Sequence, residues 1–213
     1  MSMSHAPIPI VDLGAGQLVS KALAQGGCPS VVLGNEAGLI STEGTLIFLA
    51  FGHSPHMARS VADCDWSTDL HGPLDRCFST IRHVGPKVRE HQGLLVTVLP
   101  GEALLTRRGA GAQSVLYRSI LGLMEGLRAE LLPTQARVSI VFTDQQEPLD
   151  DLAQRLSATI AARSMYSLPS CFDVAAIRAV FEQMTEALAQ TPSDARLPPA
   201  GPMGEVYREA VGG

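Results

Sequence analysis

The sequence has no run rich in lysine and arginine, and this absence limits its partners. Its formal net charge is −5 over 213 residues, so it offers no cluster of cations to neutralise the phosphates of a nucleic acid. Its apolar runs are far shorter than a membrane-spanning helix, and its first residues lack the basic-then-apolar order of a signal peptide. The sequence therefore predicts a cytoplasmic protein that binds neither nucleic acid nor membrane.

Cysteine and histidine also lack a metal-binding spacing. The four cysteines lie far apart and form no C-x-x-C pair, which argues against a metal knuckle or a redox motif and favours buried free thiols. His53 and His56 are three residues apart, but Pro55 between them favours a loop, and a zinc site needs three or four ligands. We therefore expect no metal site.

What the sequence does contain is an alternation of helix and strand patterns, in a composition of 46% apolar and 17% charged residues that is ordinary for a globular domain. Between residues 111 and 132 apolar side chains recur at three- and four-residue spacing, and Pro133 ends this helix. Residues 137–142 then have the pattern of a buried, β-branched strand. A helix that leads into a buried strand is half of a βαβ unit, so a parallel sheet is indicated.

The N-terminal pattern predicts a candidate dinucleotide site. Residues 8–13 have the pattern of a strand, and Gly14, Gly16, a short helix and a strand at 30–33 follow. In this order the free N–H groups at the helix start can bind a pyrophosphate, and Glu36 lies where an acidic residue would bind the ribose. No third glycine follows Gly16 within reach, so the residues favour a structural turn over a cofactor site.

Several short motifs resemble the short-chain dehydrogenase/reductase family. They are Tyr117, Gly126-Leu127, Ala129-Glu130-Leu131 and Arg137-Val138, together with Asp69-Leu70-His71-Gly72-Pro73. The segment from Leu46 to Gly52 is similar to the strand of that family that ends in L-V-x-N-A-G, although its asparagine is absent. The resemblance implies that Tyr117 and Asp69 are the candidate catalytic residues, and that Gly14, Gly16, Glu36 and Gly52 would contact NAD(P).

Most residues that this chemistry requires are replaced. The family's lysine, one turn after the tyrosine, is Leu121 here, its asparagine is Asp69, and residues 100–105 contain no serine where the family binds a substrate carbonyl. A lysine ammonium lowers the pKa of a tyrosine from about 10 toward neutrality, and a leucine cannot do so. Tyr117 is therefore expected to be a structural, hydrogen-bonded residue.

Two segments are shorter than in that family. Only eleven residues, 34–44, stand where the family has a helix and a strand, and only residues 145–148 stand where it has a substrate lid. The resemblance implies a Rossmann-like, doubly wound α/β sheet of about six mostly parallel strands with helices on both faces, without the lid and without one strand-helix unit. We expect this domain to span residues 1–190, and residues 191–213, rich in proline and glycine, to form a flexible tail.

The helices predicted at 65–91 and 111–132 each carry an apolar stripe. In the family the equivalent helices pack against a second subunit, so the resemblance implies a homodimer or a heteromer. Within the first helix, Pro73 and Pro86 are expected to kink or end the helix and so to divide it into two pieces.

Three functions remain open from the sequence. A chain that keeps the helices but replaces the catalytic residues suits a non-catalytic scaffold or dimer partner, for which no cofactor is expected. The alternative is an atypical NAD(P)H-dependent oxidoreductase that acts on a carbonyl or hydroxyl substrate. The third is a small-molecule binder that uses the vacated cofactor cleft. One fold of this type hosts many activities, so the choice depends on the site.

Overall fold

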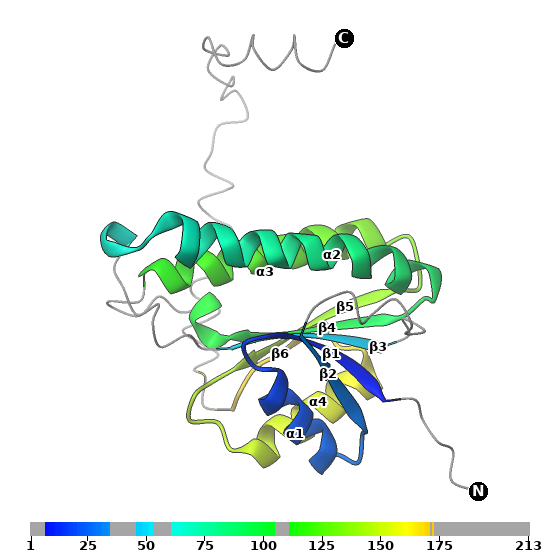
Figure 1. Cartoon of the computed structure of the whole chain (residues 1–213). Helices are drawn as coiled ribbons and strands as arrows, with labels where there is room; N and C mark the ends of the chain where they lie inside the picture. The colour runs from blue at the N-terminus through cyan, green and yellow to red at the C-terminus, as the bar shows by residue number, and fades with distance from the viewer. Residues whose placement is uncertain (1–6, 35–45, 53–60, 105–110, 171, 173–213) are drawn as a thin grey trace, which may run out of the picture. The chain divides into compact units, whose positions relative to one another are not determined.

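The fold is an open parallel sheet with helices on both faces, seen in a computed structural model that describes residues 7–34, 46–52, 61–104, 111–170 and 172 (Figure 1). The elements in chain order are β1 (Ile8–Leu13), α1 (Gly16–Gln25), β2 (Ser30–Leu33), β3 (Leu46–Phe51), η3 (Val61–Asp63), η4 (Trp66–His71), α2 (Gly72–Glu90), β4 (Leu94–Pro100), η5 (Gly101–Ala103), α3 (Gly111–Leu131), β5 (Arg137–Thr143), α4 (Leu149–Ala162) and β6 (Tyr166–Ser167).

The strands lie in the order β2-β1-β3-β4-β5-β6, and every pairing between neighbours is parallel. The chain leaves β1 toward β2 on one side and later continues to β3 on the other, so the sheet has its switch point at β1 and β3. The prediction of about six parallel strands in a doubly wound sheet is confirmed. Within the described residues β2 is an edge strand, which agrees with the expected loss of one strand-helix unit.

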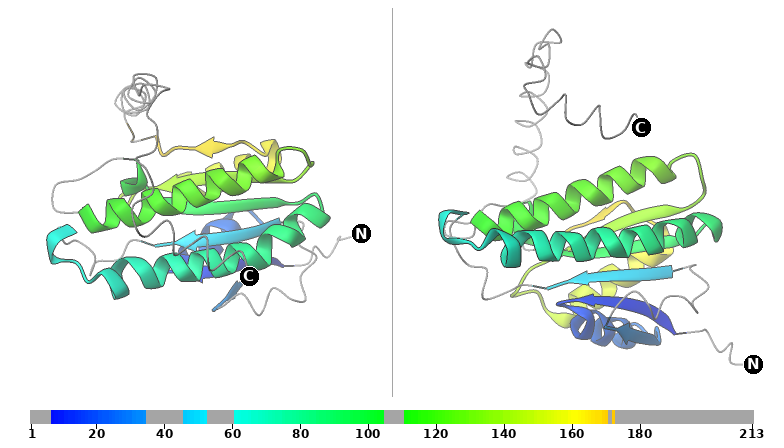
Figure 2. Two further views of the ribbon diagram at one scale, coloured as in Figure 1. Left: turned by 90° about the horizontal axis from the view of Figure 1, so that it is seen from above. Right: turned by 45° about the horizontal axis from the view of Figure 1, so that its top comes forward.

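Two helices cover each face of this sheet. Helices α2 and α3 lie side by side on one face, and α1 and α4 lie on the other (Figures 1 and 2). Val19, Leu23 and Leu156 join the apolar core between the sheet and the α1–α4 layer. On the opposite face the buried Thr97 hydroxyl donates a hydrogen bond to the Met124 sulfur at 3.0 Å. Both faces of β3 and β4 are therefore covered, as their continuous apolar sequences require.

The region predicted as one interrupted helix at 65–91 does consist of two pieces, but only one of the two prolines marks a boundary. A short π-helix, η4, leads into α2, and Pro73 stands in the first turn of α2, where a proline is well tolerated. Pro86 does not end the helix, because α2 continues through it to Glu90. Pro86 and Arg82, four residues earlier, are both exposed, so water can bind the Arg82 carbonyl that lacks an N–H partner.

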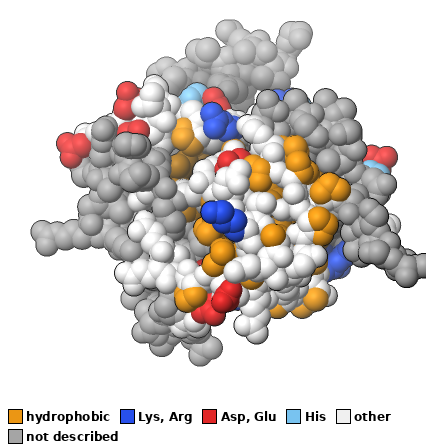
Figure 3. Space-filling view, turned by 60° about the horizontal axis from the view of Figure 1, so that its bottom comes forward, with side chains coloured by type: hydrophobic (Ala, Val, Ile, Leu, Met, Phe, Trp, Pro, Cys, Tyr) orange, Lys and Arg blue, Asp and Glu red, His pale blue; other side chains and the backbone are white. Residues whose placement is uncertain are grey.

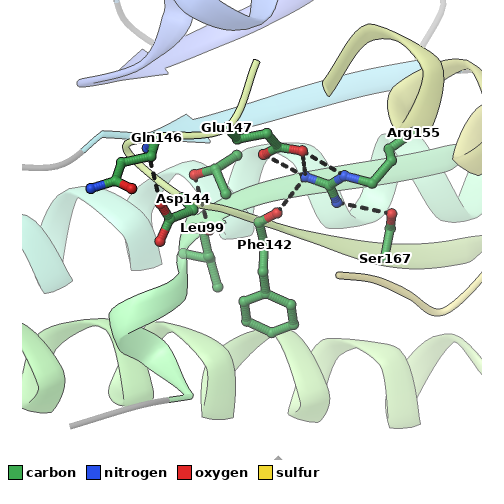
Figure 4. A network of polar contacts seen from close by, with 8 residues as sticks. Leu99, Phe142, Asp144, Gln146, Glu147, Arg155 and Ser167 are labelled. Carbon is green, nitrogen blue, oxygen red and sulfur yellow. Dashed lines mark hydrogen bonds and ion pairs between the residues drawn. The ribbon is translucent and has the colours of Figure 1, made fainter. Parts of the chain in front are cut away.

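The connection from β5 to α4 is held by a buried ion pair (Figure 4). Arg155 donates from Nε and Nη2 to the two carboxylate oxygens of Glu147, at 2.7 and 2.8 Å. It also donates to the Phe142 carbonyl at 2.7 Å and to the Ser167 hydroxyl at 3.0 Å. The side chains of Arg155 and Glu147 are only 15% and 4% exposed. This short connection occupies the place where the resemblance would put a substrate lid.

Burial and the arginine act in opposite directions on Glu147. Removal from water raises the pKa of its carboxyl above the ordinary value, while the hydrogen bond and the charge of Arg155 lower it, and the first effect is the larger. Forming the pair therefore costs desolvation free energy. If one partner is removed, the charge that remains is buried without compensation, and the fold is destabilised.

Among the described cysteines, Cys77 is a fully buried thiol, as predicted, and burial raises its pKa to about 12. Cys28 and Cys64 are only half-buried. No helix within the described ranges is long and apolar enough to span a membrane. The predicted domain end at residue 190 and the tail at 191–213 lie outside the described residues.

Candidate functional site

Two cavities lie at the carboxyl ends of β1 and β3, the edge at which open parallel sheets bind ligands. The larger has a volume of about 390 Å³ and is lined by Gly52, Asp69 and Tyr117 among others. The smaller, of about 170 Å³, lies over the turn that contains Gly14 and Gly16. The structure thus brings these five candidate residues to one edge of the sheet, while Glu36 lies outside the described residues.

The turn after β1 is closed by the carboxylate of Asp12. Its Oδ1 accepts hydrogen bonds from the backbone N–H groups of Gly14 and Gly16, each at 2.8 Å. The Ala15 N–H between them donates to the Ala50 carbonyl at 3.2 Å. These groups stand at the amino end of α1, which attracts anions through its dipole and its free N–H groups. A carboxylate of the chain itself thus occupies donors that a pyrophosphate would need.

Backbone conformation and close contacts within the protein explain why glycine occupies these positions. Gly14 has φ +117°, a conformation that side chains disfavour. A Cβ on Gly16 would stand 2.7 Å from Cγ of Asp12 and 2.9 Å from Cγ1 of Val32, so a larger residue would displace the carboxylate. A Cβ on Gly52 would collide with the Gly14 carbonyl. Their binding of a cofactor stays a prediction, because these contacts account for the glycines without one.

Tyr117 lies at the start of α3 and is only 2% exposed. Its hydroxyl donates a hydrogen bond of 2.7 Å to the Gly52 carbonyl, which ties α3 to the end of β3. One turn later Leu121 is half-buried and apolar, and no lysine lines the cavity. The phenol proton is thus directed at the backbone, which agrees with the structural role expected from the sequence.

Asp69 lies on η4 and takes part in capping this short helix. Its Oδ2 accepts a hydrogen bond from the Asp65 N–H at 2.9 Å. The Asp65 carboxylate in turn accepts from the N–H groups of Ser67 and Thr68, at 2.9 and 3.3 Å. Asp69 also lines the larger cavity, where an ionised carboxylate can only accept hydrogen bonds. Its role in proton transfer stays a prediction.

Phe172 packs against the segment 100–105, in which the resemblance expects the carbonyl-binding serine. Its buried ring packs against Gly101, directly after β4, and a Cβ on Gly101 would collide with that ring. No serine side chain fits at residue 101 while Phe172 stays in place. The sequence analysis missed both this residue and Asp12; only the position of Asp12, two residues before a glycine turn, was a readable signal, since aspartate there closes an Asx-turn.

Metal binding finds no support within the described ranges, where no group of three or more His, Cys, Asp or Glu side chains is placed to hold an ion. His53 and His56 lie outside these ranges. Around the larger cavity the charged groups among the lining residues are the carboxylate of Asp69 and the guanidinium of Arg76.

Comparison with solved structures assigns this architecture. A short-chain dehydrogenase from Burkholderia cenocepacia, solved in complex with NADP, matches with a TM-score of 0.61 over 87% of this chain and 98% of that chain, at 17% sequence identity. The chain has the short-chain dehydrogenase fold. The resemblance seen in the sequence is thereby confirmed for the fold.

Two further dehydrogenase structures extend the match. A bulky-bulky ketone specific alcohol dehydrogenase from Comamonas testosteroni has a TM-score of 0.65 and 12% identity, covering 92% of this chain and 99% of that chain. A short-chain dehydrogenase from Streptomyces avermitilis has a TM-score of 0.61 and 12% identity, covering 99% and 98%. No family model and no curated protein sequence matches the chain. Identities this low establish the fold and leave the activity to the site.

Proposed function

We propose that this protein is a non-catalytic member of the short-chain dehydrogenase fold that acts as an assembly partner through α2 and α3. The observation that carries the proposal is the Asp12 carboxylate, which holds the N–H groups of Gly14 and Gly16 at the cofactor turn. An anion placed there has to compete with a built-in anion for the same donors, and the two negative charges repel each other at close range.

The reductase residues support the same conclusion. The Tyr117 hydroxyl donates to the Gly52 carbonyl, Leu121 cannot stabilise a phenolate, and Phe172 packs on Gly101 in the segment where the resemblance expects the serine. Each of these is a packing or hydrogen-bonding contact of the folded protein. Proton transfer to a substrate would need Tyr117 to exchange a satisfied buried hydrogen bond for one to the ligand.

The assembly role is supported by the outer side of α2. One stripe of this helix, which includes Cys77, Val84 and Val88, is buried within the domain. A second stripe, Leu74, Phe78 and Ile81, lies at four- and three-residue spacing on another side of the helix. Phe78 is 52% exposed and its two neighbours are half-buried. The monomer therefore does not need this stripe for its own core.

The adjacent surface of α3 is suited to close contact. Val115 is an exposed apolar residue, and a Cβ at Gly122 or Gly126 would meet no atom within 4 Å. A helix of a second copy could approach the backbone there. On the layer formed by α1 and α4, hydrophobic side chains occur in small groups between polar and backbone atoms (Figure 3).

The first test is a titration with NADH and NADPH followed by the melting temperature, which any ligand of the native state raises. We expect no shift for the wild type at about 1 mM nucleotide, where a Kd of about 100 μM would add about 1.4 kcal/mol of stability. Asp12→Ser removes the charge and should gain measurable binding. Asp150→Ser, an exposed carboxylate in the first turn of α4, is the control for net charge. Binding by the wild type tighter than about 100 μM would overturn the proposal.

The second test concerns assembly and uses light scattering after gel filtration. A mass above the 22.6 kDa of one chain is expected for the wild type. Phe78→Glu should shift the protein to one chain, because it puts a charge into the apolar contact. Leu18→Glu, at an exposed leucine of α1 on the opposite layer, should leave the mass unchanged. If the wild type has the mass of a monomer at about 100 μM protein, a concentration at which a homodimer with a micromolar Kd would form, the homodimer is contradicted.

The alternative, an atypical NAD(P)H-dependent oxidoreductase, has one observation in its favour. The cavity of about 390 Å³ brings Tyr117 and Asp69 to the same wall at the sheet edge. The nucleotide titration decides between the two functions, because the oxidoreductase has to bind a nicotinamide nucleotide and the assembly partner does not.

A further inference from the structure

The larger cavity contains a cation that the fold does not use. Arg76, on the second turn of α2, lines it, and its guanidinium forms no hydrogen bond or ion pair with any residue that the structure describes. Two other arginines, Arg128 and Arg155, are each paired with a carboxylate. Arg76 therefore differs from them in having five N–H donors available at the wall of a cavity.

Four apolar side chains form part of the remaining cavity wall. Leu13, Phe51, Pro73 and Leu116 line it beside Arg76. At about 390 Å³ it has the volume of a typical small-molecule site. A wall that combines apolar side chains with a guanidinium suits molecules that have an apolar body and one negatively charged end. The Tyr117 hydroxyl is already bonded to Gly52, so the strongest unused polar group in the wall is the guanidinium.

Two features limit the charge of the ligand. A guanidinium matches the planar fork of a carboxylate with two parallel hydrogen bonds. The acidic residue Asp69 lines the same cavity, and its negative charge would repel a dianionic phosphate about twice as strongly as a carboxylate, which has a single charge. Arg76 is an exposed side chain, so a neutral ligand would leave its guanidinium to water and gain no charge-assisted pair.

We propose that this cavity is a binding site for a small amphipathic carboxylate, whose charged end pairs with Arg76 and whose apolar body lies against Leu13, Phe51 and Leu116. The site lies beside the turn after β1 that contains Gly14 and Gly16, and it does not include Asp12. It goes beyond the assembly role and is independent of nucleotide binding.

The test uses octanoate and its neutral analogue octanamide, with binding measured by calorimetry and by the amide NMR shifts of the protein. We expect octanoate to bind with a Kd below about 1 mM, in the weak range of specific affinities, and octanamide to bind at least about ten times more weakly, as loss of a charge-assisted pair requires. The shifts should include Gly52 and Leu116 in the cavity wall.

Arg76→Gln should weaken octanoate to the level of octanamide. Arg82→Gln is the matched control, because Arg82 is an exposed arginine on the same helix outside the cavity wall, and it should leave both affinities unchanged. Octyl phosphate as the dianion should bind no better than octanoate. The proposal is overturned if octanoate does not bind at about 10 mM, far above that Kd, if octanamide binds equally well, or if the two arginine variants behave alike.

Discussion

Substitution of Arg155 by methionine is expected to destabilise the fold strongly, and the loss should depend on pH. Methionine keeps much of the side-chain volume but removes every hydrogen bond to Glu147, Phe142 and Ser167. The carboxylate left behind has a side chain only 4% exposed. Breaking one half of a buried pair costs about 3–5 kcal/mol. For a domain of this size that corresponds to a fall of about 6–20 °C in Tm.

The pH dependence follows from the raised pKa of Glu147. A carboxyl whose folded pKa lies above its unfolded value binds its proton more tightly in the folded state. Its contribution to stability is fully present below pH 4.5 and is lost as pH rises through the folded pKa. Without Arg155 its hydrogen bond and its charge no longer lower this pKa, so the pKa rises further. The penalty of Arg155→Met should therefore be smaller at pH 5 than at pH 7.

Urea unfolding at these two pH values measures the effect. The double variant Glu147→Leu with Arg155→Met should recover most of the loss at pH 7, because a buried pair replaced by apolar groups is often neutral or stabilising. Arg82→Met, at an exposed arginine, should change stability by less than about 0.5 kcal/mol. A penalty equal at both pH values, or a double variant as unstable as the single one, would refute the reasoning.

Three further predictions concern the site and the core. Tyr117→Phe should lower the unfolding free energy by about 1–3 kcal/mol, since it leaves the Gly52 carbonyl without its donor; an unchanged urea midpoint would contradict that role. Gly101→Ser should lower the unfolding free energy by about 1–3 kcal/mol through its collision with Phe172. In the background of Phe172→Ala, Gly101→Ser should no longer show the share of this loss that the collision causes. Cys77 should resist thiol reagents until the protein unfolds, because it is buried with a pKa of about 12; mass spectrometry after labelling locates any modified thiol.

The layout of the sheet could be predicted because its central strands are mostly apolar and β-branched. Residues 94–99 and 138–142 carry this pattern, and both faces of the corresponding strands are buried. The effect of Pro86 could not be predicted, because the missing N–H is harmful only where its partner carbonyl is shielded from water, and here that position is exposed. Exposure depends on the packing of α2 on the sheet, which a local pattern does not report.

The sequence predicted which residues form the candidate site better than it predicted the contacts that they make. The resemblance assigned Gly14, Gly52 and Tyr117 to one active site, and the three residues line two cavities at one edge of the sheet, while their roles stay predictions. The contact of Phe172 with Gly101 joins residues that are seventy-one positions apart, and such a pairing leaves no periodic signal. Asp12 lies close to its partners in the chain, but the direction of its carboxylate depends on the turn that it closes.

The contact between Phe172 and Gly101 also bears on how the protein is handled in the laboratory. The ring of Phe172 covers the end of β4, and the backbone N–H of this residue donates to the Pro169 carbonyl at 3.1 Å. A recombinant version that stopped after β6 would expose that strand end to solvent. The minimal unit for crystallisation or NMR therefore has to extend through Phe172, and libraries that vary its length should start from that residue.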